Sequence, residues 1–158
     1  MVDAAHLCYS ACASLFGAPE HVHLQAFTGG EVACVDALLA AREFLAKGAP
    51  FVLIAAADSW LRVDDIEHAL QLGRLLDGES GCGFIPGEGA AAVLIGAGSA
   101  DAPLCIEGLG LAEEVATLLS ELPCHGKGLA QAMRAALQEA RWQAHEVDLR
   151  ISDAAGEP

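Results

Sequence analysis

The sequence predicts one α/β domain over residues 1–158, built from helices and strands packed in α/β/α layers. Two observations support this prediction. Hydrophobic residues make up 54% of the chain, against 19% charged and 5% aromatic, so the interior consists largely of small aliphatic side chains that pack between helices and a sheet. Segments of helical period also alternate with short apolar runs along the chain.

The first half of the chain, residues 1–98, contains a predicted strand–helix–strand unit. Apolar and polar residues alternate over 21–27, which predicts a strand, and the following "TGG" breaks it. Apolar positions then recur at helical spacing over 31–47, where Gly48 can end the helix. The continuous apolar run 51–58 is typical of a strand covered on both faces, so the segment forms a predicted βαβ unit.

The remaining elements follow from the same two periods, and those from residue 103 onward form the second half, 103–158. They are a helix over 3–16, a mostly helical 59–76, a strand at 91–96, a strand starting at 104 with a loop to 114, a helix over 126–142 and a strand at 147–152.

Charge and hydropathy exclude several classes of function. No apolar run reaches the roughly 18 to 20 residues that span a bilayer, and the N-terminus lacks the pattern of a signal peptide. A net charge of −14 repels nucleic acid and anionic lipid. We therefore expect a cytoplasmic protein that binds neither nucleic acid nor membrane.

The cysteines and histidines give no pattern of a metal site. The six cysteines contain no C-x-x-C pair, so most are expected to be buried free thiols. His21 and His23 alternate on one strand face as two metal ligands could, but no third ligand accompanies them, which favours surface histidines. We expect no metal and no cofactor.

Three segments, which follow one another along the chain at 29–61, 83–95 and 128–152, resemble the β-ketoacyl-acyl carrier protein synthases of the thiolase superfamily. "GFIPGEGAAAVLI" (83–95) resembles the acidic Gly turn and central strand of those condensing enzymes. "GGEVACVDALLAAREFLAKGAPFVLIAAADSWL" (29–61) is similar to their nucleophile turn, its helix and the next strand. Residues 128–152 resemble the first helix and second strand of the family's second half. The resemblance implies a thiolase-like fold, incomplete relative to the five-layered αβαβα fold, and a role in fatty-acid or polyketide metabolism.

The resemblance places Glu31 where the family has its nucleophilic cysteine. In the family, that cysteine lies between a strand and a helix N-terminus, where the free N–H groups lower its pKa and bind an oxyanion. Cys12 has no preceding strand or following Gly turn and is expected to pack in the core. Cys34, one helical turn after Glu31, is an outside candidate for the nucleophile. A carboxylate accepts an acyl group poorly, since the anhydride formed is no lower in energy than a thioester.

Glycines mark two turns near this implied site. Gly29 and Gly30 precede the helix, and Gly87 and Gly89 are expected to adopt positive φ or to pack closely against backbone. Between the latter two, Glu88 could accept backbone N–H groups within the turn. The "GLGLAE" stretch (108–113) lacks the third Gly and the Lys of a phosphate loop, so its glycines are attributed to turn chemistry.

The family's other catalytic groups are also missing. A His-Gly-Thr turn would follow the strand at 147–152, where this chain reads "SDAAGEP", and the second histidine and a lysine would lie beyond Pro158. The resemblance therefore implies a synthase-like protein with impaired condensation. The alternatives are an active condensing or decarboxylating acyltransferase, and a non-catalytic subunit like a chain-length factor or a fragment of a longer synthase.

The resemblance also implies partners. The family's nucleophile strand pairs across a dimer axis, so residues 21–27 are the expected homodimer contact. An acyl carrier protein is a possible partner, although steering of an acidic carrier is weak at a net charge of −14. The basic candidates in the first half are Arg42, Lys47, Arg62 and Arg74.

Overall fold

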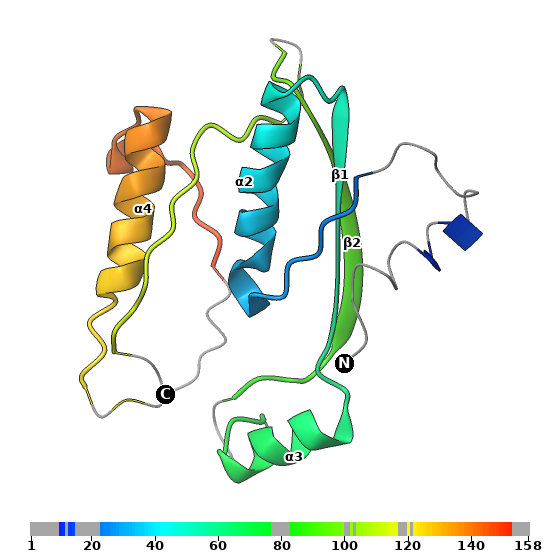
Figure 1. The fold of residues 1–158 in the computed structure, drawn as a ribbon. Helices are drawn as coiled ribbons and strands as arrows, with labels where there is room; N and C mark the ends of the chain where they lie inside the picture. The colour runs from blue at the N-terminus through cyan, green and yellow to red at the C-terminus, as the bar shows by residue number, and fades with distance from the viewer. Residues whose placement is uncertain are drawn as a thin grey trace.

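The computed structural model describes residues 10–11, 13–14, 23–76, 83–99, 102, 104–116, 120 and 122–152, apart from the side chain of Glu31. This part of the chain combines helices with a two-stranded sheet, which confirms the α/β class (Figure 1). The elements are the 3₁₀ turn η1 (Gly30–Val32), α2 (Ala33–Ala46), β1 (Phe51–Ser59), α3 (Val63–Gln71), β2 (Glu88–Gly96), α4 (Lys127–Ala140) and η2 (Ala144–Glu146).

Strands β1 and β2 form an antiparallel pair. Their register runs from Phe51 opposite Gly96 to Ser59 opposite Glu88. Both predicted strands are therefore present, and β2 begins three residues before the predicted start at residue 91. β2 can extend to Glu88 because every residue of β1 up to Ser59 supplies a partner across the pair.

The first strand of the predicted βαβ unit is absent, so that prediction is wrong for the described part of the segment. Residues 23–27 have no strand assignment, and residues 21 and 22 lie outside the described residues. Alternation of apolar and polar residues alone does not produce a strand, because the backbone N–H and C=O groups of a strand need a neighbouring strand as partner. The helix predicted over 3–16 also lies mostly outside the described residues.

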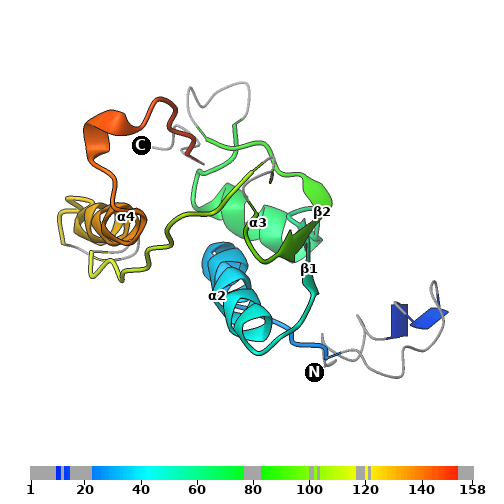
Figure 2. The ribbon, with the colours of Figure 1, turned by 90° about the horizontal axis from the view of Figure 1, so that it is seen from above.

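Helix α2 covers one face of the sheet (Figure 2). The helix was predicted over 31–47, and its first residues form η1 instead of α-helix. Ala41 of α2 and Ile54 of β1 are both buried, and a small side chain at position 41 lets helix and strand approach closely. A short connection after Lys47 reverses the chain, so α2 begins at the end of the sheet where β1 finishes and β2 starts (Figure 1).

Helix α3 is shorter than the predicted 59–76. β1 continues to Ser59, and the helix starts only at Val63, with Asp64 and Asp65 in its first turn. Gly73 has φ 63° and ends the helical course. An isolated parallel bridge then joins Leu75 to Phe84, and the Phe84 ring forms a T-shaped pair with the Trp60 ring at 5.3 Å between centroids.

Helix α4 confirms the predicted helix at 126–142, but the two strands predicted around it, from 104 and over 147–152, are not formed in the described residues. Residues 105–114 instead run alongside α4 as extended chain (Figure 1). This segment obtains its packing from a helix and not from a neighbouring strand.

The expectation that the 51–58 strand is buried on both faces is wrong. The buried hydrophobic residues of the described chain are four: Ala41, Ile54, Ala69 and Ala116. Phe51 and Leu53 are each 63% exposed and Leu94 is 62% exposed, because α2 lies against the opposite face only. No helix in the described residues is long and apolar enough to cross a membrane.

Candidate functional site

The turn before α2 has the backbone geometry that its glycines suggest. Gly30 has φ 65°, a left-handed conformation that favours glycine, whereas Gly29 has φ −78°. The backbone of Glu31 lies in η1, one residue before the helix cap at Val32, and its side chain is outside the described part of the structure. Val32 offers no side-chain cap to the first turn of α2. Position 31 therefore lies in the turn that leads into the helix.

Cys34 lies in the first turn of α2 as a free, exposed thiol. The other described cysteines, Cys105 and Cys124, are also free and exposed, so the expectation of buried thiols is wrong for all three. Residues 8, 12 and 82 lie outside the described residues. Apolar neighbours in sequence did not lead to burial here because the described elements leave most apolar side chains half-covered or exposed.

The "PGEGA" stretch lies at the same end of the α2–sheet pair as Gly29 and Gly30 (Figure 1), but it has a different geometry from the one expected. Gly87 and Gly89 lack positive φ, and a Cβ on either would meet nothing within 4 Å. Gly87 C=O accepts a hydrogen bond from Trp60 N at 2.9 Å. Glu88 and Gly89 are the first residues of β2, so they belong to a strand and not to a tight turn.

Glu88 accepts a hydrogen bond from a side chain and not from the turn backbone. The Ser59 hydroxyl donates to Glu88 Oε2 at 3.1 Å, and Ser59 Oγ itself accepts from Leu61 N at 3.3 Å. This pair borders an open hollow of about 810 Å³. The hollow is lined by Ala57, Asp58, Ser59, Arg62, Asp65, Glu88, Gly89 and Ala90.

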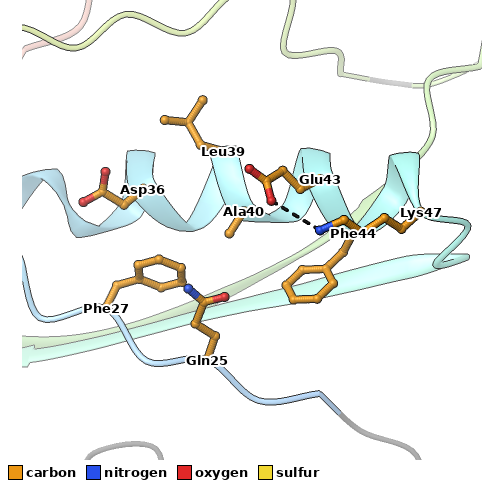
Figure 3. Close-up of a pocket in the computed structure, with 8 residues that line it drawn as sticks. All are labelled: Gln25, Phe27, Asp36, Leu39, Ala40, Glu43, Phe44 and Lys47. Carbon is orange, nitrogen blue, oxygen red and sulfur yellow. Dashed lines mark hydrogen bonds and ion pairs between the residues drawn. The ribbon is translucent and has the colours of Figure 1, made fainter.

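A second hollow, of about 500 Å³, lies between α2 and the chain that precedes it (Figure 3). The Phe27 and Phe44 rings lie on the same side of α2 as Ala40, with Gln25 between them. Lys47 Nζ contacts Glu43 Oε2 at 3.5 Å on the rim. Neither Cys34 nor the glycine turn lines this hollow, so the site residues implied by the resemblance do not converge on it.

Two carboxylates, Glu139 and Glu114, make polar contacts elsewhere, around α4. Glu139 Oε2 accepts from Leu109 N at 2.7 Å, and its carboxylate pairs with Arg42 of α2. The Leu109 N–H, followed by the Arg42 guanidinium, lowers the pKa of Glu139 below the ordinary carboxyl value. No local sequence pattern indicates this contact, since Arg42 and Glu139 are 97 positions apart.

Glu114 accepts a hydrogen bond from the N-terminal end of α4. Its Oε2 accepts from Gly128 N at 2.8 Å, and its Oε1 accepts from Ala116 N at 3.3 Å. These N–H groups, that of Gly128 most of all, lower the pKa of Glu114. Because Gly128 lies in the first turn of α4, a carboxylate 14 positions upstream performs the role of a helix cap.

The glycines of "GLGLAE" serve close packing and not the turn chemistry expected of them. A Cβ on Gly110 would lie 2.7 Å from Ala136 N, and one on Gly108 would lie 3.0 Å from Ala140 N. Gly128 is equally crowded, with Glu114 N at 2.8 Å from such a Cβ. The segment and the helix thus run antiparallel at backbone contact.

No group of three or more His, Cys, Asp or Glu side chains in the described residues could hold a metal ion. Comparison with protein-family models, with curated proteins and with solved structures finds no match to this chain.

Proposed function

We propose that this chain is a β-ketoacyl synthase-like protein of fatty-acid or polyketide metabolism in which Glu31 occupies the nucleophile position, so that it does not run the condensation. The proposal includes a thiolase-like arrangement of the helix and strands around that position. One observation supports it most directly: Gly30, with φ 65°, and Glu31 form the turn that leads into α2. A nucleophile placed here would lie beside the free N–H groups of the helix start.

The chemistry of a carboxylate supports a non-catalytic role. Attack of a carboxylate on a thioester would break the C–S bond and leave a mixed anhydride, which reacts back with the released thiol. A glutamate at a helix N-terminus is, however, electrostatically favourable. The protein then serves as a partner subunit, comparable to a chain-length factor.

An active acyltransferase is the second candidate, and one observation favours it. Cys34 is a free, exposed thiol within the first turn of α2, three residues after Glu31. If this thiol accepts acyl groups, the nucleophile has moved by about one helical turn, and decarboxylation or transfer becomes possible.

The four basic residues of the first half give an acyl carrier protein little to bind. Arg42 pairs with Glu139, Lys47 with Glu43, and Arg62 lies 3.9 Å from Asp64 and from Asp65. Arg74 stacks on the Phe84 ring, with 5.7 Å from Cζ to the ring centroid. At a net charge of −14, we propose that any contact with an acidic carrier is weak and is not steered by charge.

Intact mass spectrometry after incubation with an acyl-thioester tests this function. We expect no stoichiometric adduct on the wild-type chain and a selective acyl adduct at position 31 in Glu31→Cys. Ala46→Cys is the matched control, because it places an exposed thiol at the other end of the same helix. A stoichiometric wild-type adduct that Cys34→Ala removes would establish the active alternative. Acylation of Glu31→Cys no faster than of Ala46→Cys would overturn the assignment of position 31.

A further inference from the structure

The face of the sheet opposite α2, here called the outer face, is apolar over most of its length. Residues opposite each other in an antiparallel pair share a face, and Ile54 and Val52 face α2. The alternate residues therefore form the outer face. They are Phe51, Leu53, Ala55, Ala57 and Ser59 of β1, and Glu88, Ala90, Ala92, Leu94 and Gly96 of β2.

The outer face is large enough to be an interaction surface. Phe51, Leu53 and Leu94 are each more than 60% exposed, and the four alanines are exposed as well. Their exposed area is on the order of 600 Å², at the upper end of the apolar patches found on monomeric proteins. Ser59 and Glu88 form one polar end of the face, where the Ser59 hydroxyl donates to the Glu88 carboxylate, and the other eight residues carry no charge.

Side-chain size changes along the outer face. The bulky side chains, Phe51, Leu53 and Leu94, gather at the end where β1 begins. The other end carries Ala57 and Ala90, which line the hollow of about 810 Å³ together with the charged residues Asp58, Arg62, Asp65 and Glu88. One end of the face therefore projects, and the other end is hollowed.

We propose that the outer face binds the outer face of a second copy of this chain, with the bulky end of each copy over the hollow of the other. A two-fold axis that lies in the interface plane and runs perpendicular to the strands produces this arrangement. It turns the outer face of one copy onto the outer face of the other and reverses the direction of the strands. The two sheets would lie roughly 10 Å apart. Two copies would bury about 1,200 Å² in total, which reaches the size of specific interfaces.

The salt dependence of binding distinguishes a second copy of this chain from a basic partner protein on the outer face. Two chains of −14 repel each other at long range, so salt screening strengthens their association. A basic partner protein would instead bind more weakly as salt rises. This interface is also separate from the dimer contact expected at residues 21–27.

Sedimentation equilibrium of the full chain at 50 and 500 mM NaCl tests the proposal. We expect a dimer whose dissociation constant falls as salt rises. Leu53→Glu should raise that constant roughly tenfold or more, because it places a charge in the buried interface. Leu129→Glu is the matched control, since Leu129 is 68% exposed and belongs to α4, which lies apart from the sheet (Figure 1), and it should leave the dimer unchanged.

Ala57→Phe tests the fit of bulky end to hollow without making the surface polar. It enlarges the apolar surface at an exposed position but fills the hollow, so the dimer should weaken. A tighter dimer in Ala57→Phe would reveal unspecific apolar contact and overturn the proposed packing. A monomeric wild-type chain at both salt concentrations, or a dimer that neither Leu53→Glu nor Ala57→Phe weakens, would overturn the interface itself.

Discussion

Arg42 of α2 and Glu139 of α4 form an ion pair across 97 positions of the chain. Arg42 donates to both carboxylate oxygens of Glu139, and the same carboxylate accepts the backbone N–H of Leu109. One carboxylate thus joins α2, α4 and the segment that runs between residues 105 and 114.

Glu139→Gln should weaken the contacts of position 139 with Arg42 and Leu109, here called the Glu139 junction. The amide keeps a hydrogen-bond acceptor for Leu109 N but loses the charge that pairs with Arg42. We expect faster amide exchange at Leu109 and a lower urea midpoint. Glu43→Gln is the control, since Glu43 and Lys47 form an exposed pair within one helix and such pairs contribute little. Equal effects of the two substitutions would contradict the junction.

Acid should weaken the same region. The pKa values of Glu139 and Glu114 are lowered in the folded chain, by the N–H of Leu109 and by the N–H of Gly128, respectively. A depressed folded pKa gives stability that is present above the ordinary value of 4.5 and is lost as the pH falls through the folded pKa.

We therefore expect the free energy of unfolding to decrease below about pH 4.5. The double variant Glu114→Gln and Glu139→Gln should show a flatter pH dependence in urea titrations between pH 6 and 3. An unchanged slope in the double variant would show that other carboxylates carry the acid sensitivity.

Gly110→Ala should separate the 105–114 segment from α4. The added Cβ would meet backbone atoms of Ala132 and Ala136, which cannot rotate away as a side chain can. We expect destabilisation of roughly 2 kcal/mol in thermal or urea unfolding. Gly98→Ala should have little effect, because a Cβ there meets nothing within 4 Å.

Gly30→Ala should destabilise the turn at the proposed nucleophile position. Its φ of 65° lies in the left-handed region, where a Cβ costs about 1 kcal/mol or more, although the space around it is open. Gly87→Ala is the control, since Gly87 has neither positive φ nor a close neighbour. A thermal midpoint lowered equally by both would mean that the turn carries no conformational requirement.

The sequence was informative where one segment determines its own structure. The helical period of α2 and α4 and the apolar runs of β1 and β2 are local properties, and all four elements form close to their predicted bounds. Gly30 was likewise identifiable as part of the turn before a helix, although its φ became known only from the structure.

Features that depend on distant partners were missed. The apolar residues near 104–109 and 147–151 resemble strands, yet the first segment packs against α4 and neither finds a neighbouring strand in the described residues. Spacing says nothing of the direction in which two strands pair, so the antiparallel partnership of β1 with β2 was not foreseen. Burial was overestimated because the sequence pattern does not reveal which faces receive a covering layer.

The remote cap on α4 has a consequence for the order of folding. Gly126 supplies no capping side chain, and no acidic residue lies in the first turn, so the helix lacks a start signal of its own. Glu114 supplies that signal only after the chain around it has reached Gly128. We therefore expect formation of the first turn of α4 to be coupled to the approach of Glu114 to Gly128, so that α4 completes its N-terminus late.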